Sequence, residues 1–170
     1  PQYSQFCYTF QYMPGTPTYL DTPVIPVAAF AGPGQFPLDC EFADGTPKIK
    51  EVSNGPYVPS GGGTLTIVSE GSVFVPNPAY CPSTASECTG TLVNETKTVS
   101  RDYSFGNSGA SSSVQLVPSQ GDPITLTTNL SWAADSITVT VPSTVPNGLY
   151  QLVVTRSNGK SSITGVTVQK

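Results

Sequence analysis

The chain has 170 residues and a net charge of −4, and only 11% of its residues are charged, against roughly 25% in an average soluble domain. Its seven Lys and Arg residues are scattered and cannot form the basic patch that neutralises nucleic-acid phosphates. We therefore expect no nucleic-acid partner and no binding to an anionic membrane surface. No apolar run approaches the ~20 residues that span a bilayer, so we also expect no membrane span.

The first 46 residues have no Lys or Arg and are rich in proline and aromatic residues. Phe6, Tyr8, Phe10 and Tyr12 alternate with polar residues and Cys7, which predicts a strand with one aromatic face. Three roles are open for this face. It could cap the core of its own domain, stack on sugars, or add as a strand to the sheet of a neighbouring copy.

Prolines recur between residues 14 and 37, a density that excludes a helix or a central strand. We expect this stretch to run as an extended strap over the domain. Asp39, Glu41 and Asp44 follow closely and could offer oxygen ligands to calcium. Their spacing misses the D-x-D-x-D-G loop, and a solvated acidic turn is the alternative.

The four cysteines, Cys7, Cys40, Cys81 and Cys88, are even in number and lack CxxC spacing. This predicts two disulfides rather than a four-thiolate metal site, and therefore an extracellular or cell-surface location. Three pairings are possible, and we favour Cys81–Cys88 together with Cys7–Cys40. Because the chain opens on Pro1 without the zones of a signal peptide, we expect a removed leader or an excised segment.

From residue 47 onward, apolar and polar residues alternate between turn signals, which is typical of half-buried β-strands. The predicted strands are Lys48–Val52, Thr64–Val68, Ser72–Val75, Ser113–Val117, Ile124–Trp132, Ile137–Val141, Leu149–Thr155 and Val166–Val168. Residues 91–105 are expected to form a hairpin or one long strand. Asn158-Gly159 predicts a type I′ turn, whose central residues both need positive φ.

Residues 47–170 resemble the IPT/TIG type of immunoglobulin-like domain, and the motifs that carry the resemblance lie at the two ends of this range. The matching motifs are Pro47-Lys48-Ile49, the glycines 61–63 with Thr64–Ile67, Ser136–Pro142, Asn147–Val154, Asn158-Gly159 and Val166–Val168. The carboxy-terminal sandwich of galactose-oxidase-like enzymes ends similarly. The resemblance implies an all-β immunoglobulin-like sandwich over 47–170, with an insertion at 76–112, and the cysteine count adds the disulfide staples. The aromatic strand and Pro-rich strap of 1–46 have no counterpart in the family.

Such domains are usually non-catalytic modules of surface proteins, adhesins, secreted polysaccharide enzymes and some receptors, and the resemblance supplies no catalytic residues. The chain has no histidine, which removes Ser-His-Asp nucleophiles and the common zinc and copper sites. We expect no enzyme activity, no cofactor and no resident metal.

Several further residues are candidates for binding or modification. Trp132 is the only tryptophan and has a core role by default. If exposed, it would join Tyr57 as a sugar-stacking candidate. Asn94 and Asn129 each begin an N-glycosylation sequon.

The leading hypothesis is a non-enzymatic extracellular structural or adhesive protein. It would be a surface module or a filament subunit, joined to other copies of itself or to surface proteins by strand addition from residues 6–12. The alternative is a carbohydrate-binding accessory domain of a secreted polysaccharide-active enzyme, whose glycan-stacking residues would come from Tyr3, Tyr8, Tyr12, Tyr57 and Trp132. A catalytic β-sandwich lyase or hydrolase is a third reading, against which the lack of histidine counts.

Overall fold

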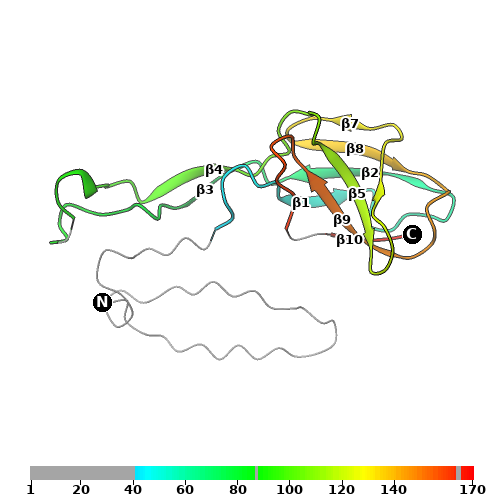
Figure 1. Cartoon of the computed structure of the whole chain (residues 1–170), viewed down its shortest axis with the longest axis horizontal. Coiled ribbons are helices and arrows are strands. Elements are labelled where there is room, and N and C mark those ends of the chain that lie inside the picture. Colours follow the sequence, from blue (N-terminus) through cyan, green and yellow to red (C-terminus); the bar gives the residue numbers. More distant parts are fainter. Residues whose placement is uncertain (1–40, 87, 164–165) are drawn as a thin grey trace, which may run out of the picture. The chain divides into compact units, whose positions relative to one another are not determined.

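A computed structural model describes residues 41–86, 88–163 and 166–170 (Figure 1). As the sequence predicts, the chain is all-β with antiparallel sheets. Its described residues fall into two compact units. One contains 41–42 and Phe74–Val99, and the other contains Ala43–Val73 and Ser100–Lys170. Within these ranges no helix has the length and apolar character that crossing a bilayer requires.

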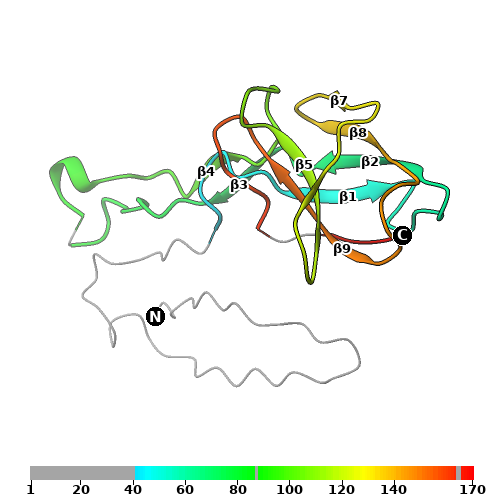
Figure 2. The ribbon, with the colours of Figure 1, turned by 45° about the vertical axis from the view of Figure 1, so that its right-hand side comes forward.

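The second unit is built from two four-stranded sheets, whose strands cross one another in two successive views (Figures 1 and 2). The first sheet has the order β1 (Ile49–Ser53), β2 (Gly63–Ser69), β8 (Ser136–Val141) and β7 (Ser131–Trp132). The second has the order β10 (Val166–Gln169), β9 (Leu149–Thr155), β5 (Ser113–Pro118) and β6 (Ile124–Thr125).

Alternate residues of both sheets meet in one apolar core. The fully buried members are Leu65, Ile67, Val114, Leu116, Ile137, Val139, Val141, Leu152, Val154 and Val168, together with Phe105. Each buried Val, Leu or Ile stabilises the fold by about 1.5–3 kcal/mol relative to its exposed state. The alternation that predicted the strands is therefore the alternation that fills the core.

A tyrosine near the start of β9 ties the preceding loop to this core. The ring of Tyr150 is 5% exposed, and its hydroxyl donates a 2.7 Å hydrogen bond to the carbonyl of Pro146. The hydroxyl thus keeps a partner while the ring is buried, which a buried phenol requires. The bond fixes how the chain enters β9.

The prediction of one strand over 124–132 is wrong, because the chain changes sheets there. The N–H of Leu126 still bonds to the carbonyl of Val114 in the second sheet at 2.8 Å. Two residues later, the carbonyl of Thr128 accepts the N–H of Thr140 in the first sheet at 2.9 Å. Period-two alternation reports which residues face the core but not which sheet they pair with, so it could not reveal this crossing.

The predicted type I′ turn is also wrong. The N–H of Gly159 bonds to the carbonyl of Arg156 at 2.9 Å, and Gly159 has a φ of 81°, whereas Asn158 does not have positive φ. A tight turn followed by a left-handed glycine is the common three-residue hairpin loop. Positive-φ asparagines lie instead at Asn54, with a φ of 59°, and at Asn129, with a φ of 51°, inside the sheet crossing.

The expectation of a hairpin or one long strand over 91–105 is corrected to a shorter strand. Residues Thr98–Asp102 form β4, which pairs with β3 (Ser72–Pro76) in a separate two-stranded sheet. A single 3₁₀ turn, η3 (Gly90–Leu92), precedes it. Residues 95–97 lie outside any strand, and Asn94 forms an isolated bridge with Cys81.

The first unit is braced across its loop by a disulfide and a backbone bridge. The Cys81–Cys88 disulfide is confirmed, with Cα atoms 5.5 Å apart, whereas Cys7 and Cys40 lie outside the described residues. Cys81 and Asn94 exchange two backbone hydrogen bonds of 2.8 and 2.7 Å. Both links close the loop between residues 81 and 94.

The Tyr150→Phe variant should lower the free energy of unfolding by about 1–2 kcal/mol, because the carbonyl of Pro146 loses its donor. Tyr57→Phe makes the same chemical change on a ring that is 73% exposed and should be nearly neutral. Urea unfolding of both variants measures the difference. Equal stability of the two variants would show that the Tyr150 bond contributes nothing.

Candidate functional site

Among the described residues, the outward-facing side chains of β5, β9 and β10 carry no charge. Residues that alternate with the buried ones point outward from β5, β9 and β10, and the strand register aligns them across the sheet. One row at the end of the face, Ser161–Thr155–Ser113, has no glutamine. The other three rows are Tyr57–Gln169–Leu149, Thr167–Gln151–Val117, and Val153–Gln115–Thr125, and each of these three contains one glutamine. We call the nine residues of these three rows the neutral face.

Tyr57 joins this face through a short parallel bridge beside β10. The N–H of Val58 bonds to the carbonyl of Gln169 at 2.8 Å, and the N–H of Gln169 bonds to the carbonyl of Pro56 at 3.0 Å. Because Val58 points into the core at 6% exposure, Tyr57 points outward and is 73% exposed. Leu149, two places along the same row, is 62% exposed. One end of the face therefore carries two exposed apolar side chains.

Threonine hydroxyls orient two of the glutamine amides. The Nε2 of Gln151 donates to Oγ1 of Thr167 at 3.1 Å, and the Nε2 of Gln115 donates to Oγ1 of Thr125 at 3.2 Å. A carboxamide has two N–H donors and an acceptor oxygen, so each amide retains capacity for a ligand after making one such bond. The face thus offers ordered hydrogen-bonding groups without charge.

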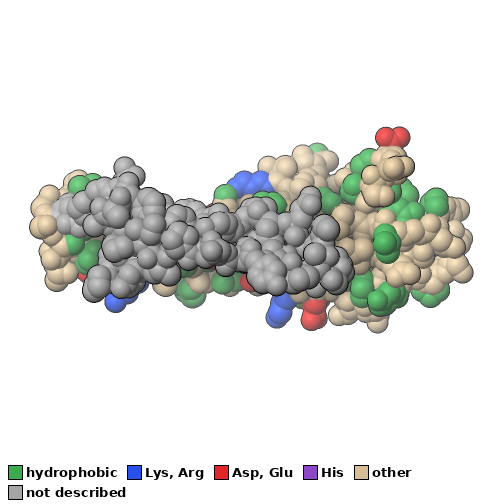
Figure 3. All heavy atoms as spheres, turned by 90° about the horizontal axis from the view of Figure 1, so that it is seen from below, with side chains coloured by type: hydrophobic (Ala, Val, Ile, Leu, Met, Phe, Trp, Pro, Cys, Tyr) green, Lys and Arg blue, Asp and Glu red, His purple; other side chains and the backbone are tan. Residues whose placement is uncertain are grey.

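The space-filling view in Figure 3 shows one side of the molecule. On the right, where the second unit lies, uncharged side chains predominate and charged ones are few. This agrees with a chain in which only 11% of residues are charged.

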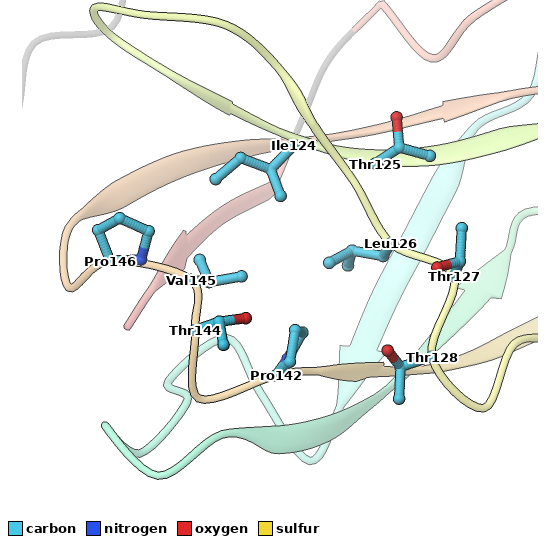
Figure 4. Close-up of a pocket in the computed structure, with 9 residues that line it drawn as sticks. All are labelled: Ile124, Thr125, Leu126, Thr127, Thr128, Pro142, Thr144, Val145 and Pro146. Atoms are coloured by element: carbon cyan, nitrogen blue, oxygen red, sulfur yellow. The ribbon is translucent and has the colours of Figure 1, made fainter.

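A separate groove of about 230 Å³ lies between residues 124–128 and 142–146 (Figure 4). Ile124, Leu126 and Val145 point into it, and threonine side chains stand around them. No titratable side chain lines the groove, so it can offer contact and hydroxyl hydrogen bonds but no acid–base chemistry.

Asp102 and Arg156 of the second unit form an ion pair that links two distant parts of the chain. The Asp102 carboxylate accepts Nη2 of Arg156 at 2.6 Å and the N–H of Ser104 at 2.9 Å. Arg156 also donates to the carbonyl of Ser104 at 3.3 Å. Partial burial alone would raise the pKa of Asp102, but the Ser104 hydrogen bonds and then Arg156 outweigh it and hold that pKa below its ordinary value.

A second lowered pKa belongs to Glu95 in the first unit. Its Oε1 accepts the hydroxyl and the backbone N–H of Ser83, both at 2.7 Å, and these hydrogen bonds lower the pKa of the carboxyl. The carboxylate ties residue 83, inside the disulfide loop, to the chain beyond it. Both acids with shifted pKa values therefore have local structural roles.

The two sugar-stacking candidates are placed on different sheets. Trp132 packs against the core, and its ring centroid lies 6.4 Å from that of Phe105 in an edge-to-face arrangement. Its indole N–H donates to the carbonyl of Gly106 at 3.0 Å. This is the default core role of a single tryptophan. Tyr57 is the candidate that presents its ring to solvent.

The calcium candidates do not form a described cluster. Asp44 accepts the N–H of Asp102 at 2.6 Å, Glu41 makes another interaction, and Asp39 lies outside the described residues. Among residues 41–86, 88–163 and 166–170, no three acidic or cysteine side chains are grouped as a metal site would need.

Of the remaining predicted residues, the two sequon asparagines are described and the aromatic residues of the N-terminal segment are not. In the sequon at Asn129 the side chain is exposed and donates to the hydroxyl of Thr140 at 3.2 Å, and in the one at Asn94 the side chain accepts the N–H of Thr96 at 3.0 Å. Phe6, Tyr8, Phe10 and Tyr12, like Tyr3, lie outside the described residues.

Sequence reasoning missed the glutamines of the neutral face. The available signal was a glutamine at an outward position of three separate strands, beside buried Leu116, Leu152 and Val168. Pairing them required the strand register, which joins residues far apart in the chain.

Comparison of the chain with protein-family models, with curated protein sequences and with solved structures gives no match.

Acid should weaken the second unit through Asp102. Because folding lowers the pKa of this carboxyl, its stabilising contribution is complete above about pH 4, the ordinary range of an unfolded aspartate, and is lost as the pH falls through the folded-state pKa. Asp102→Asn should therefore be less stable at pH 7 and lose less stability on acidification than the parent. Urea unfolding between pH 2 and pH 7 tests this.

Asp122→Asn, at an exposed loop position, is the matched control and should leave the pH profile unchanged. If the Asp102→Asn profile ran parallel to the parent profile at every pH, the Asp102 carboxylate would not be the source of acid sensitivity.

Proposed function

We propose that this chain is a non-enzymatic extracellular structural or adhesive module built on an immunoglobulin-like sandwich. The observation that carries the proposal is the neutral face, which is broad, ordered by the strand register and free of charge. Such a surface suits binding or assembly and offers no group for proton transfer.

Strand order supports the immunoglobulin-like architecture. The orders β1-β2-β8-β7 and β10-β9-β5-β6 correspond to the A-B-E-D and G-F-C-C′ sheets of that fold. The Tyr150–Pro146 bond corresponds to the tyrosine corner at the start of strand F. These features are shared by many immunoglobulin-like domains, and the IPT/TIG type that we propose is compatible with them. Strands β3 and β4 would be an insertion between strands B and C.

The distribution of charge supports a non-enzymatic role. The chain lacks histidine, and the described acids with shifted pKa values, Glu95 and Asp102, are engaged in local hydrogen bonds. Lys48 forms a 2.6 Å ion pair with Glu70 and lies over the ring of Tyr103. None of these arrangements places a base beside a nucleophile, which hydrolytic chemistry requires.

The disulfide supports an extracellular location, because such bonds persist in oxidising compartments. In this setting the module would be displayed at a surface or polymerised into a filament, with other copies of itself or surface proteins as partners. Strand addition from the aromatic segment at residues 6–12 is the proposed joint.

A second candidate is a carbohydrate-binding accessory domain of a secreted polysaccharide-active enzyme. The exposed ring of Tyr57 beside Gln169 favours it, since aromatic faces stack on pyranose rings and amides bind hydroxyls.

Strand addition is tested by the assembled mass of the oxidised chain across a concentration series, measured by light scattering. The parent should form species heavier than 17.7 kDa, and deletion of residues 1–12 should return it to the mass of one chain. The paired variants Tyr8→Ser/Phe10→Ser and Thr9→Ser/Gln11→Ser separate the aromatic face from the polar one. Assembly that survives the deletion would contradict strand addition.

A further inference from the structure

We propose that the neutral face binds a linear, uncharged polysaccharide along a diagonal of three glutamines, Gln169, Gln151 and Gln115, that begins beside Tyr57. The inference deepens the proposed function by naming what the module would adhere to. It rests on that function in one respect, which is display outside the cell.

The strand register creates the diagonal. Gln169 lies on β10 in the first row, Gln151 on β9 in the second and Gln115 on β5 in the third. Each step moves one strand across and two residues along, which places successive Cα atoms about 8 Å apart, given strands about 4.8 Å apart and about 3.4 Å per residue. Tyr57 lies directly across from Gln169 in the first row, and Thr125 lies directly across from Gln115 in the third. The shape of this diagonal line suits an extended polymer chain rather than a compact ligand.

The chemistry of the line matches sugar hydroxyls. A carboxamide both donates and accepts, as a hydroxyl does, so either orientation of the partner is satisfied. Thr167 and Thr125 already hold the amides of Gln151 and Gln115, so less side-chain entropy is lost on binding. The exposed ring of Tyr57 can stack on the C–H face of a pyranose at the end of the line.

The absence of charge selects the class of polymer. The neutral face has no Lys or Arg to pair with a carboxylate or sulfate, and desolvating an anionic chain against it would cost free energy without a compensating ion pair. A neutral polysaccharide avoids that cost. Uronic-acid and sulfated polymers are therefore expected to bind poorly.

The arrangement of apolar residues favours a polysaccharide over a protein partner. Protein interfaces usually place an apolar, aromatic-rich patch at the centre and polar groups at the rim. Here the exposed apolar residues, Tyr57 and Leu149, lie in the end row, and the central row is Thr167–Gln151–Val117. A polar centre with one terminal aromatic ring is the arrangement that a sugar chain would use.

Depletion from solution by insoluble polysaccharides tests the proposal with the full chain. The probes are amorphous cellulose, chitin and β-1,3-glucan, with polygalacturonate gel as the anionic comparison. The parent should be retained by at least one neutral polymer and not by polygalacturonate. Tyr57→Ala should weaken retention on the order of tenfold, and Gln151→Ala by about three- to tenfold.

Phe74→Ala is the matched control. Phe74 is 76% exposed, like Tyr57, but belongs to the first unit and is not part of the neutral face, so its loss should leave retention unchanged. Urea unfolding of each variant verifies that the fold is intact.

Three outcomes would overturn the proposal. They are retention by none of the three neutral polymers, stronger retention by polygalacturonate, and retention that Tyr57→Ala and Gln151→Ala leave unchanged. Light scattering on the same samples keeps the two proposals apart. A chain that assembles but binds no polysaccharide would contradict this inference alone. If assembly instead depended on Tyr57, the face would be a contact between protein copies.

Discussion

The shared apolar core of the two sheets is the constraint on which the rest of the second unit depends. Leu116, Leu152, Val154 and Val168 are fully buried within it. Because side chains alternate along a strand, burying these residues forces their neighbours outward, and a slip of one residue would exchange the two sets. The positions of Gln115, Gln151 and Gln169 on the outer face are therefore consequences of the core, and their order across the sheet is a consequence of its register.

Several charged side chains of the second unit tie loops together. Besides Asp102 and Arg156, the ammonium of Lys170 donates to three carbonyls, those of Ser60, Ser143 and Val145, at 3.0, 3.2 and 2.6 Å. These bonds hold Lys170 against two loops. Exposed charges also lie on β1 of the first sheet, at Lys50 and Glu51, whereas the neutral face of the second sheet carries amides, hydroxyls and a few apolar groups.

Local pattern was sufficient for elements that lie within one sheet. Strands β8 and β9 fall close to the ranges predicted from alternation, and the short Cys81–Cys88 loop was predicted from spacing. Pattern failed where the decisive interaction was not local. The crossing at 124–132 depends on hydrogen-bond partners in two sheets. The turn at 156–159 differs from type I′ because Gly159 has a positive φ and Asn158 does not.

The sequence could predict single residues of the candidate site but not which residues lie beside one another. Tyr57 could be singled out as an aromatic residue with a possible surface role, but its neighbours could not, because Gln169 and Leu149 reach it only through strand pairing. Trp132 had two alternatives that the sequence left open, and its contacts with Phe105 and Gly106 place it against the core. Composition thus indicated a chain with few charges, while the strand register showed which uncharged residues lie together on the neutral face.

The most direct test of the account is nuclear magnetic resonance of the glutamine side-chain amides during titration with a soluble neutral oligosaccharide such as cellohexaose, chitohexaose or laminarihexaose. These amides report on the neutral face itself and do not depend on any variant folding. The account predicts that the side-chain amide signals of Gln115, Gln151 and Gln169 shift together and saturate with at least one of the three. If the three signals stayed unshifted with every one of these oligosaccharides, the claim that this face is the binding surface would be contradicted.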